Sequence, residues 1–124
     1  MNENLVECSF LVPLVRNTDK KPHSATVWQA LERTLYETFG GSTGPEHIYR
    51  SVSGVPGSYQ DDDGSPVRDE SWRYIVALPV RQIDRLRAIL RKVANSFDQE
   101  CIYLCKPGGE VEFIRAGEDD GFLE

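Results

Sequence analysis

RQIDRLRAILRKVANSF at residues 81–97 runs directly into DQECIYLC at residues 98–105. In the first stretch, apolar residues recur at spacings of three and four, which predicts an amphipathic helix over Ile83, Leu86, Leu90, Val93 and Phe97. The second stretch ends in ECIYLC, whose composition favours a short strand. The polar DQE between them is a turn, and its position between two core elements raises the question of a functional site.

Outward from this pair, the sequence predicts further strands on either side. LVECSFLVPLV alternates over residues 5–15, HIYRSVSG covers 47–54, and SWRYIVALPV at 71–80 is rich in aromatic and branched residues. After the turn KPGG, EVEFI at 110–114 favours a short return strand. A second helix is expected in ATVWQALERTLYETF, because Ser24 is a suitable N-cap and two glycines follow Phe39.

The predicted order is β-α-β-β-α-β with an appended hairpin, which is typical of the ferredoxin-like α+β sandwich. Both helices should cover one face of an antiparallel sheet. The first and third strands should be neighbours, with the fourth on the other side of the first. We expect one domain over residues 1–115, followed by an acidic, flexible tail over residues 116–124.

In this fold, three polar segments meet at one end of the sandwich: DKKPHS at 19–24, the long loop at 55–70, and FDQE at 97–100. Long irregular loops in compact domains are often functional. The candidate ligand-binding residues are His23, Asp69, Glu70, Gln99 and Glu100. A histidine near carboxylates can act as a general acid or base near neutral pH. The alternative is that these residues only cap helices and close turns.

The uncovered face of the sheet is a second candidate surface. The first strand should place Glu7, Ser9 and Leu11 on it, together with either Arg73 and Ile75 or Trp72 and Tyr74 from the third strand. Tyr49 and Tyr103 are further candidates. A half-apolar face must be covered or bind something, so we expect a homodimer contact, a ligand cleft or the C-terminal segment there.

Composition excludes several classes of function. A net charge of −6 argues against general nucleic-acid binding, which needs a surplus of Lys and Arg. No apolar run approaches the ~20 residues of a membrane span. The N-terminus has no basic, apolar leader, so we expect a cytoplasmic protein. Cys8, Cys101 and Cys105 have no zinc or redox spacing, and His23 and His47 are expected at opposite ends, so we predict no metal and no cofactor.

Charge is distributed unevenly along the second half of the chain. Residues 81–92 contain five basic side chains and one acid, whereas residues 98–124 contain eight acids and two basic side chains. Such segments are usually solvated surfaces. They are also suited to meet each other, within one subunit or across two, or to contact another protein.

Two short motifs carry a resemblance. The first helix ends in Phe39-Gly40-Gly41, and the second leads into Phe97-x-Gln99-Glu100 ahead of a strand. From Pro22 to Ile114, the chain resembles a group of small bacterial proteins that have these motifs and no assigned activity. The resemblance implies the same fold and draws attention to Gln99 and Glu100, without implying a reaction.

Two functional hypotheses follow from the sequence. The first is a non-catalytic module that acts as a homodimer and recognises a small molecule or a protein. The second is a small enzyme with an acid/base site at the loop end, in which His23 or Glu100 transfers protons and Gln99 orients the substrate.

Overall fold

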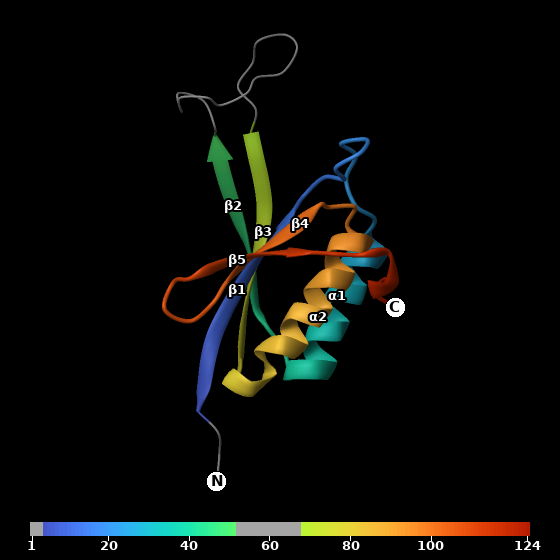
Figure 1. Cartoon of the computed structure of the whole chain (residues 1–124). Helices are drawn as coiled ribbons and strands as arrows, with labels where there is room; N and C mark the ends of the chain where they lie inside the picture. Colours follow the sequence, from blue (N-terminus) through green and yellow to red (C-terminus); the bar gives the residue numbers. More distant parts are fainter. Residues whose placement is uncertain (1–3, 52–67) are drawn as a thin grey trace.

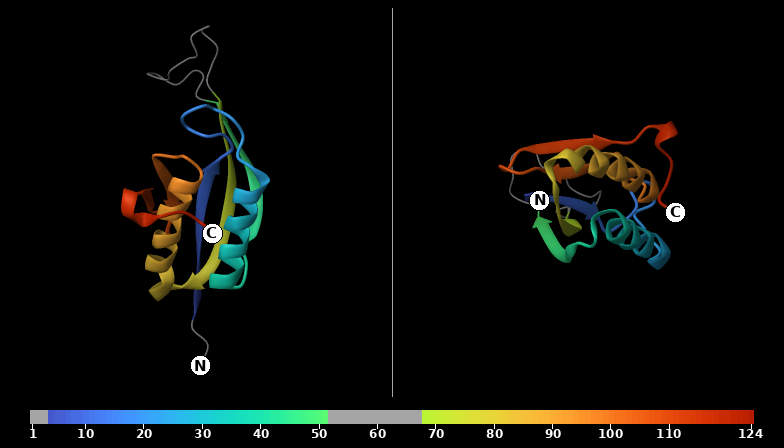
Figure 2. Two further views of the ribbon diagram at one scale, coloured as in Figure 1. Left: turned by 90° about the vertical axis from the view of Figure 1, so that its right-hand side faces the viewer. Right: turned by 90° about the horizontal axis from the view of Figure 1, so that it is seen from below.

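The computed structural model describes residues 4–51 and 68–124. The chain forms an antiparallel sheet with two helices on one of its faces, as predicted (Figures 1 and 2). The elements are β1 (Leu5–Pro13), α1 (Ala25–Phe39), β2 (Thr43–Ser51), β3 (Arg68–Pro79), α2 (Ile83–Ser96), β4 (Cys101–Cys105) and β5 (Val111–Arg115), with single 3-10 turns at Val80–Gln82 and Glu118–Asp120.

The sheet has the strand order β2-β3-β1-β4-β5, and every neighbouring pair is antiparallel. β1 therefore lies between β3 and β4, which confirms the predicted neighbours. The return strand β5 pairs with β4 along its whole length, from Cys101 opposite Arg115 to Cys105 opposite Val111.

Two strand boundaries differ from the prediction. β2 begins at Thr43, four residues earlier than expected, because the pairing with β3 continues through an irregularity between Thr43 and Glu46. β3 begins at Arg68, so Asp69 and Glu70 belong to a strand rather than to the predicted loop. Most of that loop lies outside the described residues, as does the predicted end of the second strand beyond Ser51.

The core lies between the helices and one face of the sheet. Cys8, Phe10 and Val12 of β1 alternate into it, and the β3 residues opposite Cys8 and Phe10, Val76 and Tyr74, are also buried. The helical stripes predicted from the sequence supply the other side: the stripe residues buried there are Leu31, Leu35, Leu86, Leu90, Val93 and Phe97. The period of two in the strands and the period near 3.6 in the helices thus converge on one apolar layer.

Both ends of α1 follow the expected capping chemistry. The Ser24 Oγ accepts a hydrogen bond from the Val27 backbone N–H at 3.3 Å. Gly40 has φ +85°, and its N–H donates to the Tyr36 carbonyl. Glycine reaches this left-handed conformation without the steric cost of a Cβ atom, which explains why the helix ends there.

Residues 116–124, predicted to be a flexible tail, cross the outer side of the helices (Figure 2). The Asn95 side chain donates to two backbone carbonyls of this segment, at 3.2 and 2.9 Å. The Leu123 N–H donates to the Ser96 hydroxyl at 2.8 Å, and the Leu123 side chain packs against the core. These contacts give the segment a defined position, while its flexibility stays a prediction.

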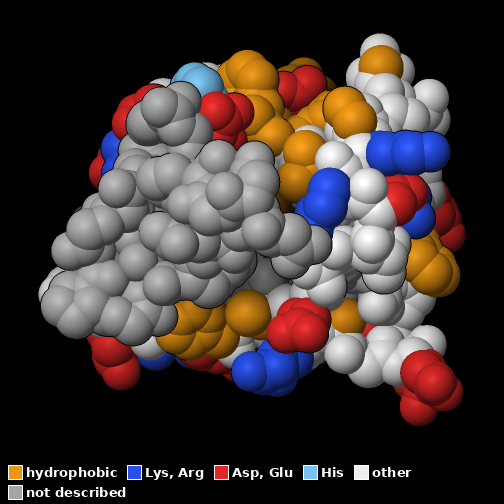
Figure 3. Space-filling model, turned by 90° about the horizontal axis from the view of Figure 1, so that it is seen from above, with side chains coloured by type: hydrophobic (Ala, Val, Ile, Leu, Met, Phe, Trp, Pro, Cys, Tyr) orange, Lys and Arg blue, Asp and Glu red, His pale blue; other side chains and the backbone are white. Residues whose placement is uncertain are grey.

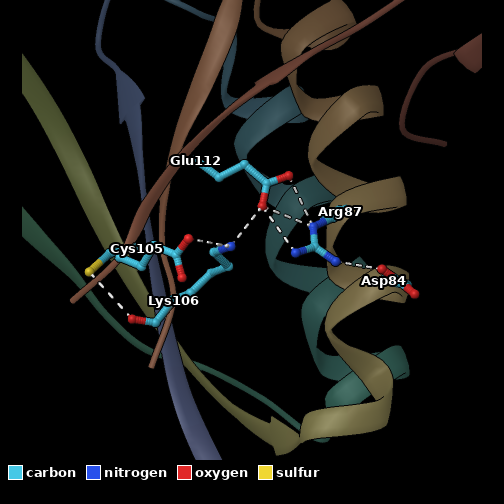
Figure 4. Close-up of polar contacts among 6 residues, drawn as sticks. Asp84, Arg87, Cys105, Lys106 and Glu112 are labelled. Carbon is cyan, nitrogen blue, oxygen red and sulfur yellow. Dashed lines mark hydrogen bonds and ion pairs between the residues drawn. The ribbon is translucent and has the colours of Figure 1, made fainter. Parts of the chain in front are cut away.

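A charged network connects α2 to the β4–β5 hairpin (Figure 4). The Glu112 carboxylate accepts hydrogen bonds from Arg87 at 3.0 and 3.1 Å, and Lys106 Nζ lies 3.3 Å from it. These bonds, led by the one from Arg87, lower the pKa of Glu112. The network therefore attaches the edge strand to the helix layer.

Replacing Glu112 with Gln should lower the free energy of unfolding by about 1–3 kcal/mol, because Arg87 and Lys106 lose their shared charged acceptor. Urea unfolding followed by circular dichroism measures this change. Glu110→Gln is the matched control: its carboxylate is 3.7 Å from Lys106 and its side chain is 77% exposed, so the change should stay below ~0.5 kcal/mol. Equal losses in both variants would contradict the assigned role of Glu112.

Candidate functional site

Two of the three predicted polar segments meet at the loop end of the sheet, where the His23 ring contacts the Phe97 ring (Figure 1). Residues 17 and 18, just before the first segment, add polar contacts. The Asn17 N–H donates to the Asp98 carbonyl at 3.0 Å. The Asp98 carboxylate accepts hydrogen bonds from the Thr18 N–H and hydroxyl at 2.9 and 2.6 Å, which lower the pKa of Asp98. The third segment lies mostly outside the described residues, so convergence of all three stays a prediction.

Gln99 fastens this loop contact. Its side-chain amide donates to the backbone carbonyls of Val15 at 2.9 Å and Phe97 at 2.8 Å. Its backbone N–H donates to the Ala94 carbonyl. Because the side-chain amide nitrogen and the backbone N–H of Gln99 both donate to backbone carbonyls, the geometry supports a role for Gln99 in positioning the loop.

Glu100 is placed differently. It is exposed just before β4, and no described residue forms a hydrogen bond or an ion pair with its carboxylate. Of the two residues in the QE motif, Glu100 is therefore the one whose carboxylate faces solvent beside the loop contact.

His23 is half-buried between aromatic rings. Its Nε2 lies 2.9 Å from the Pro13 carbonyl oxygen, an acceptor, so Nε2 carries the hydrogen. Its ring contacts Phe97 and Trp28 edge-on, with centroids 4.8 and 5.5 Å away. Burial lowers the pKa of His23, the Pro13 carbonyl opposes that change, and the neutral imidazole keeps Nδ1 as an acceptor.

Glu70 extends from β3 near the second histidine. Its carboxylate Oε2 lies 3.8 Å from His47 Nε2, and both side chains are more than one-third exposed. Its backbone carbonyl accepts the Leu14 N–H at 3.0 Å, which ties β3 to the end of β1. The side chain of Asp69 lies outside the described part of the structure.

The structure adds an aromatic row that the sequence analysis did not place in a site. The row is defined by His23, Trp28, Trp72 and His47. The Trp72 ring centroid lies 6.2 Å from that of Trp28 and 6.2 Å from that of His47. The histidines, predicted to lie at opposite ends, are thus linked by two tryptophans, and the row continues from His47 to Glu70.

Figure 3 shows hydrophobic side chains gathered at this end of the molecule, with acidic and histidine side chains beside them.

The sequence analysis left open which alternate residues of β3 face the helices, and for that reason it did not place Trp72 in a site. Phe10 pairs with Tyr74 and Val12 with Trp72, so the even-numbered residues of β3 turn toward the helices. Arg73 and Ile75 therefore occupy the open face.

Within the described residues, a cavity and a groove border the helices. A cavity of about 190 Å³ adjoins the aromatic row and is lined by Trp28, Glu32, Pro45, Trp72 and Tyr74. A groove of about 780 Å³ between α1 and α2 is larger, but exposed charged residues such as Arg33, Arg85 and Lys92 line it. We place the candidate site at the aromatic row because that groove contains none of the loop-end residues.

Within residues 4–51 and 68–124, no group of three or more His, Cys, Asp and Glu side chains is arranged to hold a metal ion. In the same part of the chain, no helix has the length and apolar character needed to cross a membrane. The candidate site consists of aromatic rings, carboxylates and imidazole side chains.

No protein-family model matches the chain, and no curated protein matches it significantly. Among solved structures, the fold is similar to that of a phage SAM lyase in complex with S-methyl-5'-thioadenosine, with a TM-score of 0.55. The match covers 94% of this chain and 93% of that chain at 17% sequence identity. The likeness shows a shared fold over nearly the whole length of both chains.

Because burial lowers the pKa of His23 in the folded state, the unfolded chain binds this proton more tightly. Stability should therefore be full above the unfolded pKa of ~6.5 and should fall as the pH decreases through the lower folded pKa. Thermal unfolding between pH 7.5 and 5 measures this loss. His23→Gln should show a smaller loss over that range, and an identical pH profile in the variant would refute the assignment.

Proposed function

We propose that the chain is a ferredoxin-like sandwich with β5 added at one edge. The order β2-β3-β1-β4 and the two helices on a single face support this assignment. The resemblance to small bacterial proteins with Phe-Gly-Gly and Phe-x-Gln-Glu motifs, and a cytoplasmic location, belong to the same proposal.

We propose further that the protein is a small enzyme whose site comprises the loop end and the aromatic row. The observation that carries this proposal is the pair of half-buried tryptophans, Trp28 and Trp72, in a row that ends at the carboxylate of Glu70. Partly open aromatic rings bind the flat face of a ligand by stacking, and a nearby carboxylate supplies proton transfer or charge stabilisation.

S-adenosylmethionine and related nucleosides are the first ligands to test. The similar fold of a SAM lyase that holds S-methyl-5'-thioadenosine supports this choice. The ligand class also fits the site chemically, because an adenine ring can stack on tryptophan and a sulfonium cation is attracted to aromatic faces and carboxylates.

In this proposal, the predicted site residues take different roles. Glu70 and Glu100 are the acid/base or charge-stabilising candidates because their carboxylates are exposed. His23 and Gln99 position the loop end through their bonds to backbone carbonyls. Asp69, next to Glu70 in β3, remains a ligand-binding candidate.

Incubation of the purified chain with S-adenosylmethionine, followed by chromatography, tests the proposal by measuring release of S-methyl-5'-thioadenosine. Glu70→Gln or Glu100→Gln should lower kcat at least ~100-fold for the residue that transfers the proton. Both variants should unfold at the wild-type temperature because the side chains are exposed. Glu110→Gln, at an exposed turn, is the control and should retain activity.

If the chain neither releases this product nor binds S-adenosylmethionine or S-methyl-5'-thioadenosine saturably, the SAM-directed form of the proposal is wrong. Activity lost together with folding would instead assign the carboxylates to structure.

A homodimer is the second candidate, and the open sheet face favours it. Its larger apolar side chains include Leu5, Leu11, Ile75, Tyr103, Val111 and Phe113. Phe113 is 61% exposed, and its ring packs against Tyr103 with centroids 5.7 Å apart. A half-apolar face with exposed large side chains is suited to pairing with a second copy, or with another protein.

Light scattering during size-exclusion chromatography should show a dimer whose dissociation constant rises at least ~10-fold on Phe113→Lys, because a charge replaces a large apolar contact. Tyr36→Lys is the control, since Tyr36 is 69% exposed but lies on α1 in the other layer. A monomer at every concentration would rule out this interface.

A further inference from the structure

The cavity beside the aromatic row has an unusual lining. Trp28 and Glu32 come from α1, Pro45 from β2, and Trp72 and Tyr74 from β3. Three of the five lining residues are aromatic, and Glu32 is the charged one. About 190 Å³ is enough space for a compact group of several carbon atoms.

The tryptophan rings form two walls that meet at an angle. Their planes are inclined by 63°, with the centroids 6.2 Å apart. Tyr74 closes the inner end, because its side chain is only 1% exposed. Three aromatic rings thus line the cavity, two of them inclined to each other, and aromatic rings are also what lines the cages that hold methylated cations.

Glu32 gives the cavity its charge. Burial and the nearby Glu32 carboxylate raise the pKa of Tyr74 far above its ordinary value, so the phenol keeps its proton beside Glu32. Glu32 lines the cavity and is also exposed to solvent. A negative charge therefore lies at the edge of an apolar, aromatic space.

We propose that this cavity binds the methylated onium group of a ligand, either a quaternary ammonium or a sulfonium. Methyl groups lose little by leaving water, whereas a primary ammonium would lose its hydrogen bonds in this apolar lining. The aromatic rings and the Glu32 carboxylate together attract the positive charge. The inference rests on the cavity itself and holds whether or not the protein cleaves S-adenosylmethionine.

Tryptophan fluorescence provides a direct measurement, because the chain contains two tryptophans and both line the cavity. Choline is the probe, trimethylsulfonium is the second cation, and 3,3-dimethylbutan-1-ol is the neutral control with the shape of choline. Both cations should change the emission saturably. The neutral alcohol should bind at least about fivefold more weakly, since it lacks the charge.

Glu32→Gln should weaken choline binding about three- to tenfold and leave the neutral alcohol unaffected. Glu37→Gln is the matched control, because Glu37 is exposed on the same helix and does not line the cavity. Its choline affinity should equal that of the wild type. Thermal unfolding of both variants verifies that the fold is retained.

Equal affinity for choline and the neutral alcohol would overturn the proposal, because the cavity would then select shape alone. Failure of both cations to produce a saturable change would also overturn it. Neither result depends on S-adenosylmethionine turnover, so the failure of this inference is distinguishable from failure of the proposed enzyme activity.

Discussion

Burial of the Phe97 ring holds the loop end of the molecule together. Phe97 is fully buried at the end of α2, and its ring packs against Trp28 of α1 at 4.7 Å and His23 of the first loop at 4.8 Å. Burial of a phenylalanine contributes roughly 1.5–3 kcal/mol, so this contact outweighs any single surface interaction nearby. It fixes where α2 stops, and hence where the following turn meets the first loop.

The turn after Phe97 forms the polar contacts with the first loop. Asp98 adopts a positive φ of 53°, which directs its carboxylate to Thr18 and lets Gln99 reach Val15. The DQE turn thus contains a residue that closes the loop contact, a residue that positions it, and an exposed carboxylate. Asp98 and Gln99 therefore have a structural role in this turn, whereas a role in a binding site stays a prediction for Glu100.

Periodicity predicted the helices and most of the core, because those features depend on which residues are apolar, and the order of elements then predicted the strand neighbours. It could not predict that β3 extends to Arg68, since that extension depends on pairing with β2. It also left the parity of residues 71–80 open, which is why Trp72 was not assigned to the helix side. Strand register supplies that information only when both partners are known.

The same limit applies to the side chains of the candidate site. His23 and Gln99 were selected for their chemistry, and the structure shows both bonded to backbone carbonyls. Such bonds depend on loop conformation, for which the sequence carries no periodic signal. The missed residues Trp28 and Glu32 lie one helical turn apart, so both face the same cavity once α1 is placed against β3.

Charge connects the local site with the whole molecule. A net charge of −6 creates a negative field that attracts cations and repels anions over distances comparable to the Debye length. Glu32 and Glu70 concentrate negative charge near the aromatic row, where half-buried rings exclude part of the water and strengthen electrostatic attraction. The long-range field of the net charge and the aromatic and acidic lining of the cavity therefore favour the same kind of ligand, a cation that also has an apolar surface. An anionic ligand would have to overcome both.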